Sequence, residues 1–504
     1  MTTDIVTKPD TTTVLKDMAK GPSTNGWDVV CSYGLIQLNK ILLDAYTADT
    51  GIAKDIQFSV THTAIMTGEK FDINYDITLG APTIQFIAGN ESSCTLTMAL
   101  EKGTFSNSID GVVKTSGTFP AGYSIVVEVP LYAVYGDNNT ATANQSIAFT
   151  GTGQASHITL HFPTDHGLWK FDPPATGNDQ LNYLLTDLVG YFQTNITDID
   201  YQLTSLTNQT DGASGDIIIE PISFVFNITS LENSNDGALS LYIQTKNTGN
   251  PQGNLKPSFQ PGDTAAFPIP QGYDASLIFS RNFMQKVYLT PELTKDNFVE
   301  VKSIIDPIST DCVGCEVDGN YNKSVNLSFS TIGYPCDLSF TCAQDPFNFA
   351  NMSYHFKFET DKLSISFDQS VTGKWHSADK AGGVVNTAGG DVNGSISLNK
   401  DYKLSDISSV TNTDISLNFS LVINDYVIDL GSSDSHFLNY KKEVTDKVEA
   451  EIKTALPSIS FKFSNINFFK TTNLLFPGKQ IISIDTKQGL HIPCDMVLFG
   501  NFVS

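Results

Sequence analysis

The chain has 504 residues, of which 40% are hydrophobic, and 54 acidic residues against 30 basic ones give a formal net charge of -24. This length predicts two or three domains, and the apolar content is too high for a disordered chain. A nucleic-acid-binding role is disfavoured, because phosphate backbones are bound mainly through lysine and arginine, and Arg281 is the single arginine.

No run of the sequence approaches the roughly 20 apolar residues that a membrane-spanning helix needs. The first ten residues lack the apolar core of a secretory signal. We therefore expect a soluble protein without a transmembrane segment. If it leaves its cell, we expect it to use a route other than the typical secretory one.

The first half of the chain predicts a helix, a long β region, a second helix and further strands. Residues 1–20 are threonine-rich and without periodicity, which predicts a flexible tail. Apolar residues at helical spacing over 27–46 predict the first helix, and short β-type runs follow to about residue 165. The second helix is predicted after the double proline at 173–174, with the apolar stripe Leu181, Leu184, Leu185, Leu188 and Phe192.

Residues 247–272 differ in character from the segments around them. They hold five prolines and four glycines. Because proline fixes φ and lacks an amide donor, this segment is predicted to be an extended, semi-rigid connector. We take it as the boundary between a first domain over residues 21–246 and a second over residues 273–504.

The second half repeats the order of the first. Residues 274–289 predict a helix with Asp274 as its N-cap, and a β region follows in which every second residue is apolar, as in 363–367. A glycine-rich stretch at 382–390 predicts a loop tip. The longest predicted helix covers 435–456, and its apolar stripe consists of Phe437, Tyr440, Val444, Val448, Ile452 and Leu456.

This repeated order indicates a tandem duplication. A long antiparallel sheet must cover its apolar face, and a sheet curled lengthwise around a helix can leave an apolar tube. The predicted fold class is α+β, with two domains in which a long curled antiparallel sheet wraps along amphipathic helices. The candidates for lining a ligand are Leu181, Leu185, Leu188, Phe192, Phe437, Val444 and Val448.

Three segments of the sequence resemble the OrfX and forty-seven-kilodalton accessory proteins encoded beside botulinum neurotoxins. They are Asn-Gly-Trp-Asp-Val-Val at 25–30, the stretch 275–289, and the end of the chain at 473–478 and 489–501. Their order fits that family over residues 24–504. The resemblance implies a tubular lipid-binding (TULIP) fold, possible recognition of membrane lipids such as phosphoinositides, and a place in a toxin-associated set of bacterial proteins. It implies no catalytic residues.

Catalytic motifs are missing from the sequence. It lacks the Walker phosphate loop, the His-Glu-x-x-His zinc-protease helix and the Gly-x-Ser-x-Gly nucleophile elbow. We therefore expect neither an enzyme nor a bound cofactor. His161, Asp165 and His166 are close enough in sequence to be metal ligands, but they flank Pro163 at a strand end, where a solvated turn is the usual structure.

Four of the seven cysteines cluster at Cys312, Cys315, Cys336 and Cys342. The first pair has the spacing of a zinc knuckle, whereas five residues separate the second pair, which is looser than usual. The alternatives are a four-thiolate zinc site, a disulfide formed after export, and free thiols. The sequence favours free thiols and no metal.

The densest positive charge lies near the C-terminus. Between residues 438 and 487 there are eight lysines and five acids, in a chain that is acidic overall. If an anionic headgroup is contacted, the candidates are Lys441, Lys442 and Lys447. A solvated helix with i,i+4 pairs such as Glu443–Lys447 explains the same charges and is favoured.

The predicted function is non-catalytic binding of a membrane lipid or another hydrophobic ligand, by a protein associated with a bacterial toxin gene cluster. The alternative is a structural accessory protein that docks to a toxin or to sibling proteins of the cluster without binding lipid.

Overall fold

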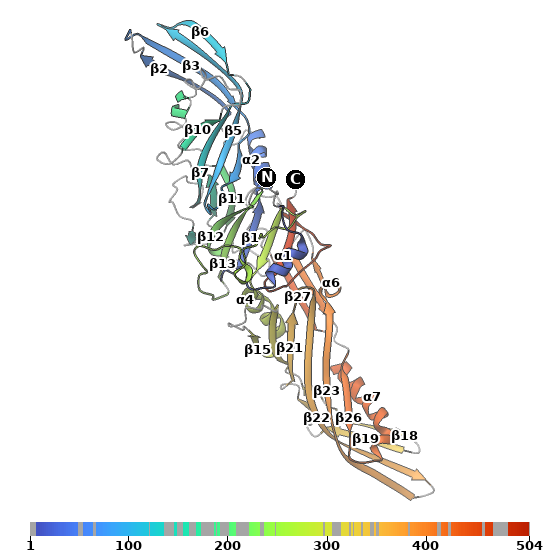
Figure 1. Ribbon diagram of the computed structural model, residues 1–504. Helices are drawn as coiled ribbons and strands as arrows, with labels where there is room; N and C mark the ends of the chain where they lie inside the picture. The colour runs from blue at the N-terminus through green and yellow to red at the C-terminus, as the bar shows by residue number, and fades with distance from the viewer. Residues whose placement is uncertain are drawn as a thin grey trace, which may run out of the picture.

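The computed structural model shows an elongated molecule. Two β-rich arms extend in opposite directions from a central sheet, and the first helix and the last strand both lie at that sheet (Figure 1). The described residues are 7–48, 54–63, 67–119, 121–135, 146–148, 155–160, 168–172, 186–187, 189–191, 201–207, 221–231, 236–246, 248–295, 298–304, 314–321, 324–325, 327–333, 336–342, 347–348, 352–381, 384–410, 415–421, 425–455, 459–466 and 482–502.

The central sheet has seven strands, which come from both halves of the chain. Their order is β28 (Ile482–Ile484), β29 (Met496–Phe502), β14 (Ala275–Phe279), β1 (Val29–Gly34), β13 (Gly237–Thr245), β12 (Pro221–Ser230) and β8 (Ser146–Ala148). β1 pairs antiparallel with β13 on one side and with β14 on the other, and β14 pairs with β29. One sheet therefore includes strands from before and after the predicted connector, and the final strands join it through β14.

Both faces of the central sheet are covered by other elements. On one face, α1 (Thr11–Met18) and the segment 259–273 cover side chains such as Val30, Tyr242 and Ile278. On the opposite face, α2 (Leu35–Thr47) belongs to the large core that includes Val29 and Cys31. Strands buried on both faces have continuous apolar sequences, and periodicity alone does not distinguish such runs from buried helices.

This two-sided burial explains why two predicted helices are wrong at their starts. Residues 29–34, expected to be helical, form β1, and the helix begins only at Leu35. Residues 275–279 likewise form β14. The helix after β14 begins at Arg281 as α4 (Arg281–Phe283), and it continues as the π-helix η2 (Met284–Leu289) and α5 (Thr290–Lys295).

Asp274 is not the N-cap of that helix. Its carboxylate accepts hydrogen bonds from the backbone N–H of Phe502, at 3.1 Å, and from Gln37 Nε2, so it joins β29 to α2. Ser280 is the cap, because its Oγ accepts from the N–H of Phe283 at 3.1 Å.

The expected tail over residues 1–20 is a packed segment from residue 7 onward. α1 begins after Asp10, whose carboxylate accepts from the N–H of Thr13 at 2.7 Å and so caps the helix. Val14 and Met18, one turn apart, are buried against the connector. The connector itself contains the 3-10 turn η1 (Pro261–Asp263) and contributes Phe259, Phe267 and Ile269 to the same cluster.

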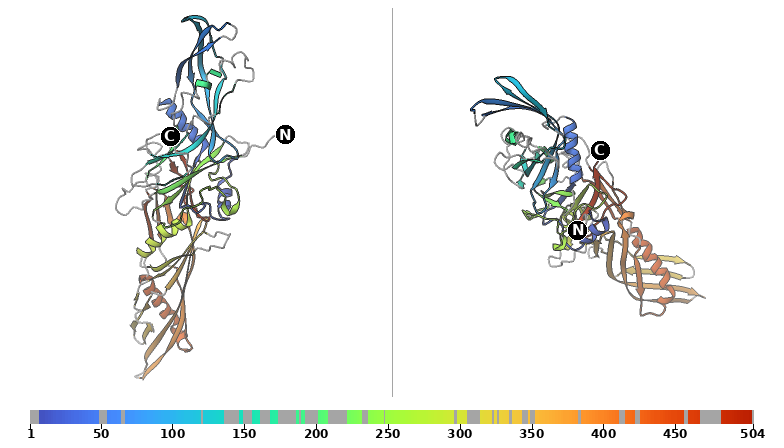
Figure 2. Two further views of the ribbon diagram at one scale, coloured as in Figure 1. Left: turned by 90° about the vertical axis from the view of Figure 1, so that its left-hand side faces the viewer. Right: turned by 45° about the horizontal axis from the view of Figure 1, so that its top comes forward.

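The first arm is built on a nine-stranded sheet. Its main path is β11 (Tyr201–Thr207), β9 (Ala155–Leu160), β7 (Ser124–Tyr135), β5 (Ser93–Ile109), β3 (Lys70–Leu79) and β2 (Asp55–Thr63), with β10 (Leu168–Asp172) on β7 and with β4 (Thr83–Phe86) and β6 (Val112–Thr118) on β5. Burial alternates along β3 and β5, so one face is apolar. The sheet curls toward the end of the arm (Figure 2).

The second arm is built on an eight-stranded sheet. Its strands are β15 (Phe298–Ile304), β16 (Cys315–Tyr321), β21 (Met352–Phe358), β22 (Lys362–Ala381), β19 (Cys336–Cys342) and β18 (Phe329–Gly333), with β23 (Val384–Lys403) between β22 and β26 (Val427–Gly431). Smaller sheets comprise β17 (Ser324–Val325) with β20 (Phe347–Asn348), and β24 (Ser408–Val410) with β25 (Ile415–Leu421) and β27 (Ile459–Ile466). The arm's helices are α6 (Leu404–Ile407) and α7 (Phe437–Ala455). The predicted long helix at 435–456 is therefore confirmed.

The glycine-rich stretch is not a loop tip from residue 384 onward. β22 and β23 pair along their whole length, from Lys362–Lys403 to Ala381–Val384. Gly389 lies inside β23, where a Cβ would come within 2.7 Å of the carbonyl oxygen of Trp375, so the close approach of the two strands requires glycine.

The strand pairs of the described part of the chain are all antiparallel, and the arms are curled sheets, as expected for a mostly β fold. None of the described helices is both long and apolar enough to cross a bilayer.

Two buried carboxylates fix the segments that carry the family resemblance. Asp28 is fully buried and accepts from the backbone N–H of Thr245 at 2.7 Å, from the hydroxyls of Thr245 and Thr248, and from Asn250 Nδ2 at 2.8 Å. Asp495 accepts from the N–H and hydroxyl of Ser23, at 2.7 and 2.9 Å, and from the N–H of Arg281 at 2.9 Å. These bonds hold the ends of β1 and β29.

We predict that Asp28→Ala destabilises the protein by about 3 kcal/mol, because it leaves several buried donors without an acceptor. Urea denaturation of the variant measures this loss. Asp44→Asn, at an exposed carboxylate of α2, is the matched control and should change stability by less than about 0.5 kcal/mol. Equal effects of the two substitutions would contradict the structural role of Asp28.

Candidate functional site

α7 lies along the sheet of the second arm and buries one face against it (Figure 1). Phe437, Val444 and Val448 recur at helical spacing and belong to the core. The ring of Trp375, from β22, lies 5.6 Å from that of Phe437 and 5.7 Å from that of Tyr440. Three of the predicted ligand-lining residues are thus brought together in the interior between α7 and the long β22–β23 hairpin.

The interior is filled by aromatic rings at its end near the central sheet. Phe298 lies edge-on to Tyr321, Tyr354 and Phe356, with ring centroids 5.2 to 5.6 Å apart. The hydroxyls of Tyr354 and Tyr426 are hydrogen-bonded at 2.8 Å, and burial raises the pKa of both. These phenols therefore stay neutral over the physiological pH range.

Two buried polar atoms lie in the part of the interior that α7 covers, and the first belongs to Trp375. Its side chain is only 2% exposed, and in the described part of the chain its indole Nε1 has no hydrogen-bond acceptor. Thr445 Oγ1, on α7, is a second buried polar atom without a described partner. Buried donors are usually satisfied in folded proteins, so these two atoms are candidates for contact with a ligand, as are Tyr242 Oη and Tyr402 Oη elsewhere among the described residues.

Asp434 stands at the start of α7 beside this tryptophan. The N–H of Asp434 donates to Ser432 Oγ at 3.2 Å, and its Oδ1 accepts from the N–H of His436 at 2.9 Å and contacts His436 Nδ1 at 3.1 Å. The hydrogen bond from the His436 backbone lowers the pKa of Asp434, with a smaller contribution from the imidazole. The carboxylate is therefore ionised and partly exposed at the edge of the interior.

The lysine candidates lie on the outer side of α7. Lys441 pairs with Asp429 at 2.9 Å and Lys442 with Asp446 at 2.6 Å. Lys447 is exposed, and no ion pair involves it among the described residues. Two of the three headgroup candidates already have carboxylate partners.

In the first arm, Leu181, Leu185, Leu188 and Phe192 lie outside the described residues. The helical residues described between them contact the apolar face of the sheet. Asp187 accepts from the hydroxyl of Tyr75 at 2.7 Å and lies 2.7 Å from His62 Nε2. Tyr191 stacks on Phe58 at 4.2 Å. Asp187 is not recognisable from the sequence as a contact residue, because a carboxylate beside an apolar stripe suggests the solvent side.

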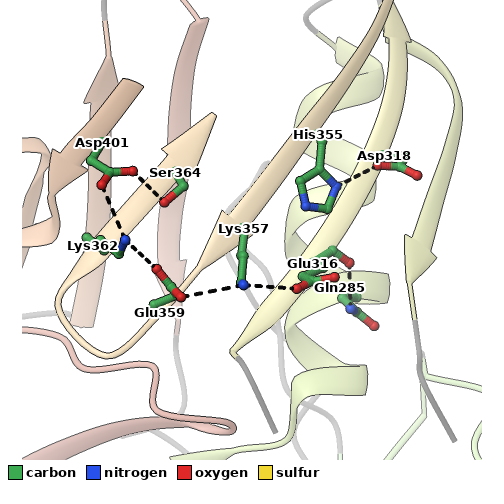
Figure 3. Close-up of polar contacts among 9 residues, drawn as sticks. All are labelled: Gln285, Glu316, Asp318, His355, Lys357, Glu359, Lys362, Ser364 and Asp401. Carbon is green, nitrogen blue, oxygen red and sulfur yellow. Dashed lines mark hydrogen bonds and ion pairs between the residues drawn. The ribbon is translucent and has the colours of Figure 1, made fainter. Parts of the chain in front are cut away.

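Charged side chains cross the outer face of the second arm's sheet (Figure 3). Lys357 lies 3.7 Å from Glu316 and 3.5 Å from Glu359, and Lys362 lies 2.7 Å from Glu359 and 3.2 Å from Asp401. Exposed pairs of this kind contribute little stability each. They identify the solvent face, and the residues that alternate with them along β22 point into the interior.

A pocket of about 940 Å³ opens at the end of this row of charges. It lies between the β21–β22 turn, α6 and residues 486–491, and its charged lining consists of Glu359, Asp361, Lys362, Lys403, Lys487 and His491. Asp361 pairs with His491 Nδ1 at 3.1 Å. Since positive and negative groups are mixed, the pocket has no clear preference for an anion or a cation.

Comparison with known proteins places the fold. No family model matches the sequence, and no curated protein sequence does. The structure is similar to that of P47 from Clostridium botulinum A2, with a TM-score of 0.51 and 14% identity over 96% of this chain and 99% of that one. The chain shares the fold of P47.

The likeness to P47 confirms, at the level of the fold, the resemblance seen in three segments of the sequence. Those segments include the start of β1, the whole of β14 and most of β29, which lie at the centre of the sheet that joins the arms. A lipopolysaccharide binding protein also aligns over 96% of this chain, at 10% identity, but its TM-score of 0.24 is too low to indicate a shared fold.

The cysteines are not gathered into a metal site within the described part of the chain. Cys31, Cys94 and Cys315 are buried free thiols, and Cys494 is disulfide-bonded. Cys312 and the side chains of Cys336 and Cys342 lie outside the described residues, as do His161, Asp165 and His166.

We predict that the buried thiols are unreactive in the folded protein. Burial raises the pKa of Cys31 and Cys315 to about 12, so almost no thiolate is present at pH 8. Brief treatment with iodoacetamide at that pH, followed by peptide mass spectrometry, should leave Cys31, Cys94 and Cys315 unmodified. The same treatment in guanidinium chloride should modify all three, and rapid labelling of the native protein would contradict their burial.

We also predict that Phe437→Ala lowers the free energy of unfolding by about 3 to 4 kcal/mol, since it empties a buried aromatic position. Leu438→Ala removes the next side chain of the same helix, which is 67% exposed, and should cost less than about 0.5 kcal/mol. Urea denaturation of the two variants compares them directly. Similar losses would show that α7 does not pack as described.

Proposed function

We propose that this protein binds a lipid or another hydrophobic ligand without catalysing a reaction, within a set of proteins associated with a bacterial toxin. In the finer form of the proposal, each arm is a TULIP-like unit, with a curled sheet that holds its ligand against amphipathic helices. The fold shared with P47 supports the proposal, as does the sequence resemblance to accessory proteins encoded beside botulinum neurotoxins.

The observation that carries the proposal is the composition of the interior under α7. It combines an apolar stripe, from Phe437 to Val448, with the buried indole N–H of Trp375, which has no acceptor among the described residues. Ligand sites typically pair a mostly apolar lining with a few polar groups that fix the orientation of the ligand.

A direct test determines whether the purified protein carries a ligand and where that ligand binds. Protein purified under native conditions should carry lipid that native mass spectrometry detects and organic solvent extracts. The delipidated protein should bind a fluorescent acyl probe saturably, with energy transfer from Trp375. Lack of lipid in the extract together with lack of saturable probe binding would refute the proposal.

Matched tryptophan variants locate the bound probe. Trp375→Phe should abolish most of the energy transfer, since Trp375 lies in the interior under α7. Trp27→Phe should retain it, because Trp27 lies in the separate cluster under α1 and the connector. If Trp27→Phe abolished the energy transfer and Trp375→Phe retained it, the probe would instead bind near the central sheet.

Contact with an anionic membrane through α7 is a further part of the proposal. Because Lys441 and Lys442 are already paired, Lys447 should contribute most. Replacing Lys447 with Gln should weaken binding to vesicles that contain phosphatidylinositol phosphate about as much as replacing all three lysines. Unchanged vesicle binding by the triple variant would show that α7 is not the surface that contacts the membrane.

The alternative function is docking to a toxin or a sibling protein without a bound lipid. The elongated form with a shared central sheet suits a rigid spacer as well as a container (Figure 1). Co-purification with the products of neighbouring genes, from protein that yields no extracted lipid, would favour this alternative.

A further inference from the structure

Cys494 is disulfide-bonded, and its partner follows by elimination. The chain has seven cysteines. The free thiols among the described residues are Cys31, Cys94 and Cys315. The cysteines that remain as partners are Cys312, Cys336 and Cys342. The backbone contacts on either side of Cys494 distinguish between these three.

Cys494 lies at the base of the second arm. The N–H of Ile492, two residues earlier, donates to the carbonyl oxygen of Thr360 at 3.1 Å. Thr360 belongs to the turn between β21 and β22, and β22 begins at Lys362. Because a disulfide needs two Cα atoms within about 7 Å of each other, the partner of Cys494 must lie close to this turn.

Cys336 and Cys342 lie too far along the arm to be that partner. They stand at the two ends of β19, where their register partners on β22 are Asp379 and Gly373. From Lys362, β22 runs roughly 35 Å before it reaches Gly373, at about 3.3 Å per residue. The pairing register therefore places both cysteines far beyond the reach of a disulfide to Cys494.

A backbone contact beside Cys494 points to Cys312. The N–H of Gly314 donates to the carbonyl oxygen of Pro493 at 3.2 Å. Gly314 packs directly against Phe358, where a Cβ would overlap the carbonyl oxygen. Cys494 follows Pro493 directly, and Cys312 precedes Gly314 by two residues, at about 3.8 Å per residue. Cys312 lies outside the described residues, so its assignment depends on these neighbours.

We propose that Cys312 and Cys494 form a disulfide that clamps the base of the second arm to the central sheet. Cys494 adjoins Asp495 in the sequence. The carboxylate of Asp495 accepts from the backbone N–H groups of Ser23 and Arg281, so the disulfide and these hydrogen bonds hold the same segment before β29. The loop that the bond closes contains every strand from β16 to β28. The inference is independent of the proposed function, because it requires no ligand.

Closing the clamp is a two-electron oxidation. The thiols of Cys312 and Cys494 together give up two protons and two electrons as the S–S bond forms. A disulfide oxidant such as oxidised glutathione accepts them by exchange and becomes two thiols. Because the cytoplasm keeps thiols reduced, the clamp should close in an oxidising environment. Burial raises the pKa of Cys315 to about 12, so this neighbouring thiol has little thiolate with which to attack the bond.

Thiol labelling of the full-length protein identifies the bond directly. Protein produced in the oxidising periplasm of a bacterial host is unfolded in guanidinium chloride with N-ethylmaleimide, at mildly acidic pH and without a reductant. Every cysteine except Cys312 and Cys494 should be labelled, and proteolysis should release one pair of peptides joined through these two residues. A joined pair that contains Cys336 or Cys342, or label on both Cys312 and Cys494, would overturn the inference.

Two variants distinguish Cys312 from Cys315, the other cysteine of the Cys-Val-Gly-Cys sequence. In Cys312→Ala, Cys494 should become a free thiol that is labelled in guanidinium chloride. Cys315→Ala is the matched control, and Cys494 should stay unlabelled in it. If Cys494 is labelled in Cys315→Ala and stays unlabelled in Cys312→Ala, the inference is wrong.

The clamp should also make the stability of the protein depend on its redox state. A reductant should lower the urea midpoint of the wild type by about 1 M, as expected for a disulfide that closes a long loop in a large chain. The same reductant should leave the midpoint of Cys312→Ala unchanged. An equal fall in the variant would assign the stabilising bond to other cysteines, and an unchanged midpoint in the wild type would show that no such clamp stabilises the fold.

Discussion

The pairing of β1 with β14 is the contact on which the rest of the structure depends. It connects the two halves of the chain in register, from Val29–Phe279 to Tyr33–Ala275. The central sheet is apolar on both faces, so each face has to be buried by other elements. Each buried Val, Leu, Ile or Phe contributes about 1.5 to 3 kcal/mol, so the covers formed by α1 and the connector on one side and by α2 on the other are essential to the fold.

The sheets of the arms differ from the central sheet because only one of their faces is buried, and the candidate site lies against that buried face. In β21 and β22 burial alternates, because one face meets the interior and the other carries the charged row of Figure 3. A one-sided sheet has to be covered by a helix, which α7 supplies. Trp375 Nε1, which has no hydrogen-bond acceptor among the described residues, is one of the polar atoms buried in that interface.

The sequence predicted the parts of the fold that have a clear period. The α7 stripe of Phe437, Val444 and Val448 was identified because one face of the helix is buried and the other is exposed to solvent. The starts at residues 27 and 274 were wrong, because strands covered on both sides lose the alternation that distinguishes them from helices. That Trp375 and Asp434 both lie beside Gly390 was beyond prediction, since it depends on the register between β22 and β23 and on the loop before α7.

The bond between Ser23 and Asp495 spans 472 residues of the chain. During synthesis, β1 and the segment before it leave the ribosome long before β29 exists to complete their sheet. The arms, whose hairpins pair locally, can form first, while the centre has to wait with its apolar strands exposed. The fold thus combines fast local contacts with a slow closing step, and the nascent chain is most prone to aggregate just before that step.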